Sequence, residues 1–357
     1  MVPYILLLTV PILLHPFTRE TSINRFRLDR IPLFLFFAFL TVLVMLRHRN
    51  VGNDTNNYIY LFERFANMGW SRLTKDFTEI GYTLFNKLLS LISKEPRFFL
   101  AVIGFAVSAM IYPTYRRLCV DPPLTIVLFC VMSIFPMMLS GIRQMLAIGI
   151  GFAAYDFTRR KRPIFFLLTV AVSMTFHTSA FMLFFMYPLY HARITKKWAV
   201  YSIPILAATF AFNRQIFDFL GALLQSYTRY EVIQTSTGAY TTLILFLLFT
   251  IFSYVIPDES LLDDEMIGLR NFMLLSLVLQ MFAPLNTLAM RMNYYYIIFI
   301  PLLVPRIILY SSARYRSVAA WSRNIMLVFF LAYFFMNAKP GSNLHTVPYR
   351  FYWENHR

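Results

Sequence analysis

Charged residues are scarce in this sequence, and their scarcity restricts the fold before any motif is considered. Only 14% of the 357 residues are Asp, Glu, Lys or Arg, whereas 58% are hydrophobic and 18% aromatic. In soluble domains about a quarter of the residues are charged. The composition therefore argues against a water-soluble fold and predicts a membrane protein.

Cysteine is also scarce, and several catalytic motifs are missing. Cys119 and Cys130 lie in or beside apolar segments without CxxC or Cys/His spacing, so we expect packing residues rather than a disulfide framework or a zinc site. The sequence has no P-loop, GxSxG, HExxH or Asp-x-Asp pair. Nucleotide hydrolysis, serine hydrolysis and metal-dependent sugar-nucleotide transfer are disfavoured. We expect neither a metal ion nor a cofactor.

Acidic residues are few beside the basic ones, with 17 Asp and Glu against 33 Lys and Arg. The resulting charge of +16 does not indicate nucleic-acid binding, because the basic residues form short clusters between apolar runs instead of one basic face. In a membrane protein such clusters report orientation. The N-terminal run lacks the basic start and cleavage site of a signal peptide, so we interpret it as a retained first span.

Apolar runs long enough, or nearly long enough, to cross a bilayer recur along the whole chain. They lie at 3–15, 31–47, 97–113, 123–139, 145–158, 163–176, 178–190, 198–212, 239–256, 267–284, 292–310 and 323–337. They lack the two-residue alternation of barrel strands, so we predict helices. The predicted fold is an all-α polytopic membrane protein of about twelve spans, with a range of roughly ten to thirteen, some short or broken. We expect a single domain, 1–357.

Clusters of Lys and Arg on alternate connections predict which side of the membrane each connection occupies. The predicted cytoplasmic clusters are Arg19 to Arg30, Arg116-Arg117, Arg159 to Arg162, Arg193 to Lys197 and Arg306 to Arg323. Three segments are then extracytoplasmic, namely 48–96, 213–238 and 338–357. The segment Asp258 to Glu265 fits poorly, because it carries five acids and no base on a connection that should be cytoplasmic.

The stretch 163–190 carries a basic cluster at each end, so both ends should be cytoplasmic. We therefore expect a hairpin or broken helix that turns near His177. Each arm of about 14 residues is roughly 21 Å long, short of the ~30 Å hydrocarbon core. His177 should then lie below the outer surface, in a recess lined by protein.

Ionisable residues converge at the predicted outer ends of spans or in the outer loop. They are Asp54, Glu79, Arg143, His177 and Arg291. The small residues Ala147, Gly151 and Ala154 follow Arg143 on one helical face, which predicts that Arg143 faces the protein; an interfacial anchor is the alternative.

Three other candidates, His177, Arg291 and Asp54, also have a structural role as the alternative to a functional one. Thr169, Ser173, His177 and Ala180 form one small, polar stripe, so His177 should face inward as either a core residue or a catalyst. Arg291 precedes Tyr294 to Tyr296, which we interpret as an interfacial belt to which the arginine could belong. Asp54, in Gly52-Asn53-Asp54, could cap a helix that starts at Thr55.

Taken in chain order, these segments resemble the EpsG family, which belongs with the Wzy-type polymerases of exopolysaccharide, capsule and O-antigen. The resemblance covers residues 50 to 310, and its most specific part is the pairing of an Arg-Gln motif with a Phe-His-x-Ser-Ala motif. The matching segments are Gly52-Asn53-Asp54 with Tyr58, Glu79-Ile80-Gly81-Tyr82, Gly141-Ile142-Arg143-Gln144, Phe176 to Ala180, and Arg291 with Tyr295-Tyr296. Pro348 to Phe351 also resembles the C-terminal end of the family.

The resemblance implies a glycosyltransferase whose donor is a glycan on undecaprenyl diphosphate and whose acceptor is a sugar hydroxyl. Arg143 and Arg291 would bind the diphosphate through planar, multidentate hydrogen bonds. Histidine suits proton transfer because free imidazole titrates near pH 6.5, so His177 is our first candidate for the base, with Asp54 or Glu79 as rivals. The expected substrate contacts are Gln144, Tyr58, Tyr82 and Tyr295.

Other functions fit parts of the same pattern. A flippase for the lipid-linked glycan would also need arginines and a histidine, although its polar residues should extend through the membrane. An O-antigen ligase performs the same class of reaction, and a membrane acyltransferase also uses histidine. By family analogy we expect the bacterial plasma membrane as the location, with a Wzx-type flippase and a chain-length regulator as partners.

Overall fold

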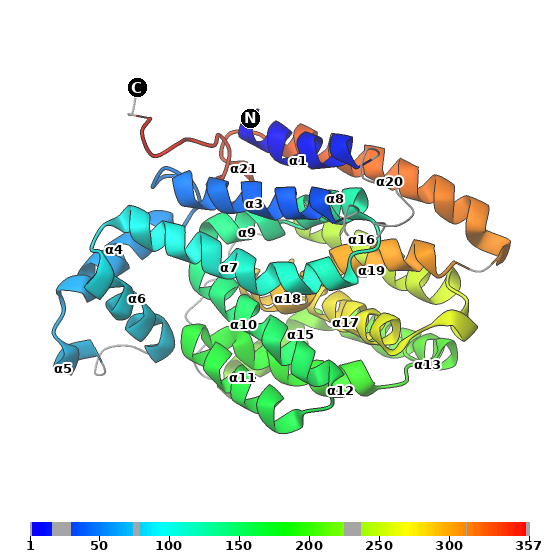
Figure 1. The fold of residues 1–357 in the computed structure, drawn as a ribbon. Helices are drawn as coiled ribbons and strands as arrows, with labels where there is room; N and C mark the ends of the chain where they lie inside the picture. Colours follow the sequence, from blue (N-terminus) through cyan, green and yellow to red (C-terminus); the bar gives the residue numbers. More distant parts are fainter. Residues whose placement is uncertain (1, 16–29, 74–78, 225–236, 312, 355–357) are drawn as a thin grey trace. The chain divides into compact units, whose positions relative to one another are not determined.

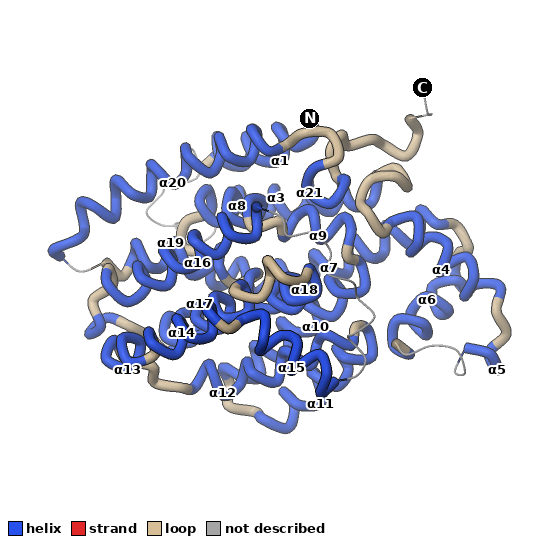
Figure 2. The backbone as a smooth tube through the Cα atoms, turned by 180° about the vertical axis from the view of Figure 1, so that it is seen from behind, coloured by secondary structure: helices blue, strands red, loops and turns tan. Residues whose placement is uncertain are grey.

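The computed structural model describes residues 2–15, 30–73, 79–224, 237–311 and 313–354, and their secondary structure is helical (Figure 1). No strand occurs in these residues, which are drawn as helices and loops in Figure 2. The β contacts found there are two isolated bridges, Arg47 with Phe351 and Pro257 with Ser311. The predicted all-helical class is therefore confirmed.

Two compact units make up the chain, and we describe each by itself. Unit 1 comprises Met1–Leu183 and Trp321–Arg357, and unit 2 comprises Phe184–Ala320. The predicted single domain stays a prediction. The helices that lie wholly in unit 1 are α1 (Val2–Leu14), α3 (Ile31–Leu46), α4 (Thr55–Asn67), α5 (Trp70–Leu73), α6 (Ile80–Ile92), α7 (Pro96–Leu118), α8 (Pro122–Val131), α9 (Ile134–Ser140), α10 (Ile142–Arg159), α11 (Pro163–Phe176) and α21 (Ser342–His345).

Unit 2 is built mainly on α16, α17, α18 and α19. Two helices have residues in both units, namely η2 (Thr178–Phe185) and α20 (Arg316–Asn337). The helices that lie wholly in unit 2 are α12 (Met186–His191), α13 (Lys196–Tyr201), α14 (Ile203–Ala211), α15 (Asn213–Leu224), α16 (Thr237–Val255), η3 (Glu259–Leu261), α17 (Asp264–Gln280), α18 (Thr287–Ile297), α19 (Ile300–Leu309) and η4 (Ala313–Tyr315).

Some of these helices are long and apolar enough to cross a membrane. Among the described residues three qualify, α7, Gly238–Val255 of α16, and α20. The count reaches five if the bent pairs α8 with α9 (53°) and α18 with α19 (50°) are single spans. Every predicted apolar run is helical, but several, such as α1 and α11, fall short of the ~20 residues of a straight span. The count of about twelve stays a prediction.

Parts of several sequence predictions lie outside the described residues. They are the basic cluster from Arg19 to Asp29, positions 74–78 of the predicted outer loop, and positions 225–236 of the second outer loop. The described parts of both predicted loops are largely helical. The first carries α4, α5 and α6, and the second carries α15.

The core of unit 1 forms where α3 and α10 pack against α7, and α10 packs along α11 (Figure 1). The predicted small-residue face of α10 is part of it, because Ala147, Gly151 and Ala154 are all buried. A side chain at Gly151 would meet Leu183, and the carbonyl of Ala147 accepts a hydrogen bond from Ser173 at 2.8 Å. Small residues thus let neighbouring segments approach closely.

The predicted break at His177 is present. Helix α11 ends at Phe176, and His177 caps it with an extended backbone (φ −156°, ψ 122°) before η2 begins. Ser173 contacts α10 at Ala147 and Leu183 contacts it at Gly151, so the chain turns at His177 and runs back along α10. Of the predicted stripe, Ser173 and Ala180 are buried, whereas Thr169 is half-buried.

The acidic segment that fitted the charge pattern poorly is paired with basic residues in unit 2. Asp264 pairs with Arg193 at 2.6 Å and Glu259 lies 4.0 Å from Lys196, both in a cluster predicted to be cytoplasmic. Arg306, from another such cluster, lies 3.6 Å from Glu265. The acids of this segment therefore neutralise basic residues of two clusters predicted to be cytoplasmic, while the side of the membrane on which they lie stays a prediction.

Candidate active site

Three polar side chains from three helices of unit 1 meet in one cluster. Glu79 stands at the N-cap of α6, Arg143 in the first turn of α10, and His177 at the C-cap of α11. Arg143 Nη1 donates to Glu79 Oε2 at 2.6 Å, and His177 Nδ1 lies 2.7 Å from Glu79 Oε1. Glu79 therefore bridges the arginine and the histidine that sequence analysis selected.

A glycine allows α6 to approach α11 closely enough for this bridge. A Cβ added at Gly81 would lie 2.1 Å from Thr175 Oγ1 and 2.8 Å from Thr175 Cβ. Thr175 is two residues before His177, so this contact sets how near Glu79 comes to the end of α11. The backbone N–H of Thr178 adds a hydrogen bond to Glu79 Oε1 at 3.3 Å.

Two tyrosines pack around the guanidinium of Arg143. Its Cζ lies 5.6 Å from the ring centroid of Tyr58 and 5.8 Å from that of Tyr82. The two rings meet edge to face at 6.1 Å, and both residues are buried. Cation–π contacts of this kind favour a planar guanidinium and restrain its orientation. These tyrosines therefore position Arg143, whether or not either also touches a substrate.

Glu79 lies in the predicted outer loop, outside the predicted spans, and it is ionised at neutral pH. Burial raises the pKa of its carboxyl, but the hydrogen bond with His177 and the positive charge of Arg143 outweigh burial. The net effect lowers the pKa of Glu79 below its ordinary value of 4.5. The carboxylate is therefore a hydrogen-bond acceptor at both oxygens.

The three side chains differ in their access to solvent. Side-chain exposure is 33% for Arg143, 21% for His177 and 10% for Glu79. Arg143 and His177 can therefore meet an incoming molecule, while Glu79 lies behind them. Gln144, which follows Arg143, is buried within α10.

Asp54 lies half-exposed at the N-cap of α4, one turn before Tyr58. The predicted turn and the predicted helix start at Thr55 are confirmed, although the side chain of Asp54 makes no capping hydrogen bond to α4. The turn needs its glycine, because Gly52 has φ +93° and an added Cβ would lie 2.5 Å from the Leu139 carbonyl oxygen. Whether Asp54 acts with the cluster stays a prediction.

Arg291 and Tyr295 belong to unit 2. That they take part in the same site as Glu79, Arg143 and His177 therefore also stays a prediction. Arg291 is exposed on the first turns of α18. Tyr294, Tyr295 and Tyr296 are 3%, 1% and 1% exposed. The interpretation of these tyrosines as an interfacial belt is wrong within unit 2, because α18 packs against α17 and buries them.

Sequence reasoning missed two contributors to the site. The backbone N–H of Thr178 binds Glu79, and Gly81 permits the close packing of α6 on α11. A signal existed for both, since Gly81 lies in the Glu79-Ile80-Gly81-Tyr82 segment and Thr178 follows His177 directly. Neither signal indicated a contact between the two segments.

The helical architecture of the described residues and their apolar helices are those of a membrane protein. Residues 30–351, nearly the whole chain, match the EpsG family. The chain therefore belongs to the EpsG family, a family of Wzy-type polysaccharide polymerases. Membership indicates a glycosyltransferase-type polymerase role in exopolysaccharide biosynthesis. No curated protein and no solved structure matches the chain.

Proposed function

We propose that this chain joins glycan repeat units carried on undecaprenyl diphosphate into a polysaccharide at the extracytoplasmic face of the bacterial plasma membrane. The observation that carries the proposal is the Glu79 carboxylate, 2.7 Å from Nδ1 of His177 and 2.6 Å from Nη1 of Arg143. It holds together the two groups that such a transfer requires. One is a base for the acceptor hydroxyl, and the other is a cation for the departing diphosphate.

In this proposal His177 is the base. The Glu79 carboxylate can only accept a hydrogen bond, so the proton of neutral imidazole lies on Nδ1 and the lone pair on Nε2. The acceptor oxygen forms a bond to the anomeric carbon of the donor while its proton passes to Nε2. The bond from that carbon to the diphosphate oxygen breaks, and the diphosphate leaves with the electron pair. Glu79 is then a positioning residue that also stabilises the imidazolium.

Arg143 binds the leaving diphosphate, for which a planar guanidinium offers several donors in a fixed fork. The charge of Glu79 cancels that of Arg143, so the cluster with neutral His177 has no net charge. A multiply anionic diphosphate needs a second cation, and Arg291 remains our candidate for it. Asp54 is assigned to orienting the acceptor, and Gln144 and Tyr295 remain candidate substrate contacts. No metal ion or cofactor enters this scheme.

Analysis of glycans from a strain that lacks the gene tests the function. We expect lipid-linked single repeat units to accumulate, and a wild-type copy to restore the ladder of longer polymers. The His177→Gln copy, produced at the same level, should not restore it. Full-length polymer that is merely left unattached would instead identify a ligase. Failure of any repeat unit to reach the outer face would identify a flippase.

A further inference from the structure

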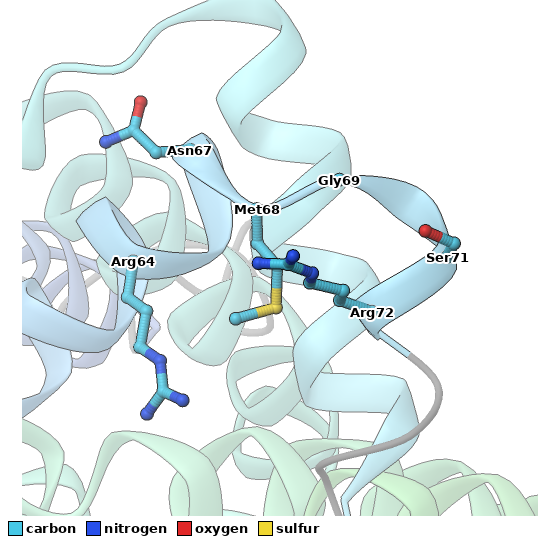
Figure 3. A pocket seen from close by; sticks show the side chains of 6 residues that line it. All are labelled: Arg64, Asn67, Met68, Gly69, Ser71 and Arg72. Carbon is cyan, nitrogen blue, oxygen red and sulfur yellow. The ribbon is translucent and has the colours of Figure 1, made fainter.

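A surface hollow of about 460 Å³ lies in unit 1 where α4 ends and α5 begins. Its volume falls in the range of small-molecule sites, roughly 300 to 1,000 Å³. Figure 3 shows the side chain of Arg64 extending from α4, while that of Arg72 extends from α5 back toward Met68. The lining residues are Arg64, Asn67, Met68, Gly69, Ser71 and Arg72.

A buried lysine adds positive charge beneath this hollow. Lys87 is 7% exposed, and its Nζ donates to the carbonyl oxygens of Ala66 at 3.1 Å and Met68 at 2.8 Å. These carbonyls belong to the C-terminal end of α4, where the helix dipole is negative. No carboxylate of the described residues forms an ion pair with Lys87, so its charge reinforces the field of the two arginines.

The hollow lies at the end of a helix whose exposed face is polar, as expected of a surface in contact with water. Helix α4 buries its apolar face, which includes Ile59, Phe62 and Phe65. Its opposite face is polar and includes an acid, unlike a helix that lies in a bilayer with its apolar side outward. The exposed residues of that face are Asn56, Asn57, Tyr60, Glu63, Arg64 and Asn67.

We propose that this hollow is a subsite for a sugar of the glycan that carries a carboxylate or phosphate group. Arg64 and Arg72 supply the donor pattern that binds such anions, while the Asn67 amide and the Ser71 hydroxyl suit sugar hydroxyls. The inference rests on the proposed function and adds a substrate class to it, an acidic repeat unit.

The position of the hollow on α4 fits this role. Helix α4 carries Tyr58, which packs on Arg143, and ends at the hollow. From Tyr58 to Asn67 the helix rises by roughly 14 Å, at 1.5 Å per residue. A glycan that reacts at His177 can therefore reach the hollow with a sugar some units from the bond being made.

Direct binding of defined oligosaccharides tests the proposal on the full chain in phosphatidylcholine nanodiscs. We expect tetragalacturonate to bind, maltotetraose to bind far more weakly, and the tetragalacturonate affinity to fall as salt is raised. Arg72→Gln and Arg64→Gln should each weaken tetragalacturonate binding by about tenfold, because each removes a charge-assisted contact. Lys94→Gln changes the net charge equally at an exposed site outside the hollow and should leave binding unchanged.

Three results would overturn the subsite. They are equal binding of the neutral and acidic tetrasaccharides, equal weakening by Lys94→Gln, or unchanged binding in both arginine variants. The alternative is that the hollow binds lipid headgroups. It is tested by replacing a third of the phosphatidylcholine with phosphatidylglycerol. Loss of tetragalacturonate binding in these discs would assign the hollow to lipid headgroups and reject the glycan subsite.

The test also separates this inference from the proposed function. His177→Gln should lower turnover by roughly 10² to 10⁴ yet bind tetragalacturonate like the wild type, because His177 does not line the hollow. If polymerisation is absent while arginine-dependent binding stands, the proposed function fails alone. If the protein polymerises repeat units but tetragalacturonate binding is unchanged in the Arg64 and Arg72 variants, the subsite is rejected and the proposed function is kept.

Discussion

Glu79 uses both of its carboxylate oxygens within the protein. Oε1 lies 2.7 Å from His177 Nδ1 and also accepts from the Thr178 N–H, while Oε2 accepts from Arg143. A carboxylate with these partners and a lowered pKa is a poor proton acceptor. This division of contacts is why we assign orientation to Glu79 and proton transfer to the more exposed His177.

The His177→Gln substitution separates a chemical role from a structural one. Glutamine keeps a hydrogen-bonding side chain but cannot take up a proton, so turnover should fall by roughly 10² to 10⁴ while lipid-linked donor still binds. The measurement is the specific activity of purified protein with excess lipid-linked repeat unit. Specific activity within about threefold of wild type would remove His177 from the catalytic residues.

The Arg143→Lys substitution tests the planar guanidinium. Lysine keeps the charge but loses both the fork for diphosphate and the contacts with the rings of Tyr58 and Tyr82. Polymer length and yield should therefore fall nearly as far as in Arg143→Ala. Arg162→Lys, at an exposed position, is the control and should keep wild-type polymer. Normal polymer from Arg143→Lys would reduce Arg143 to a point charge.

The pH dependence of thermal stability tests the ionised state of Glu79. Its folded-state pKa lies below the ordinary 4.5, so the ionised carboxylate stabilises the folded protein above that pH. This contribution is lost as the pH falls through the lowered pKa. Glu79→Gln should melt at a lower temperature than wild type at pH 7, and the difference should shrink below about pH 4.5. A difference in melting temperature between Glu79→Gln and wild type that is the same at all pH values would contradict this. Glu95→Gln, at an exposed position, is the control and should melt like the wild type at each pH.

At the scale of elements, the contact between α6 and α11 decides whether the cluster can form. In Gly81→Ala the new methyl group would lie 2.1 Å from Thr175 Oγ1, so the helices must separate and carry Glu79 away from His177. We expect a loss of about 1–3 kcal/mol in stability together with loss of polymerisation. Gly238→Ala is the matched control, because nothing lies within 4 Å of the added atom.

Unfolding in denaturant and polymer analysis of the same preparations measure both effects of Gly81→Ala. The double variant Gly81→Ala with Thr175→Ala removes the nearest clashing atom and should recover part of the activity. Full activity in the single variant would show that the approach of α6 to α11 does not position Glu79.

The C-terminal segment is another element whose role depends on packing. The N–H of Gly52 donates to the His345 carbonyl at 3.0 Å, and the N–H of His48 donates to the Arg350 carbonyl at 2.8 Å. The Tyr349 hydroxyl donates to the Leu43 carbonyl at 2.8 Å. The tail thus holds the end of α3 and the turn that leads into α4 and Tyr58.

At the scale of the whole molecule, the ion pairs connect segments that were predicted to lie on the same side of the membrane. Asp156 pairs with Arg117 at 3.0 Å and with Arg160 at 2.8 Å, which joins two clusters predicted to be cytoplasmic. The tail contacts the loop around His48, and both were predicted to be extracytoplasmic. Which of the two sides is outside stays a prediction that labelling can test.

Cysteine labelling in a background of Cys119→Ser and Cys130→Ala tests the orientation. We expect Asn57→Cys to react with an impermeant maleimide in intact cells whose outer membrane has been permeabilised, because Asn57 is exposed on α4. Arg162→Cys should react only after the inner membrane is opened. The reverse pattern would place the cluster of Glu79, Arg143 and His177 on the cytoplasmic side and reject the proposed reaction.

The sequence alone was enough to predict the helices of the apolar runs and the break at His177, but not α5, α6 and α15 in the predicted outer loops. The helices follow from the apolar runs, and the break follows from the basic clusters at both ends of 163–190. The pairing of Glu79 with Arg143 and His177 could be seen only in the tertiary structure. Arg143 lies 64 residues after Glu79 in the chain, and His177 lies 98 residues after it. Such contacts depend on how side chains of different helices interlock, as at Gly81 and Thr175, and periodicity within one helix carries no information about its neighbour.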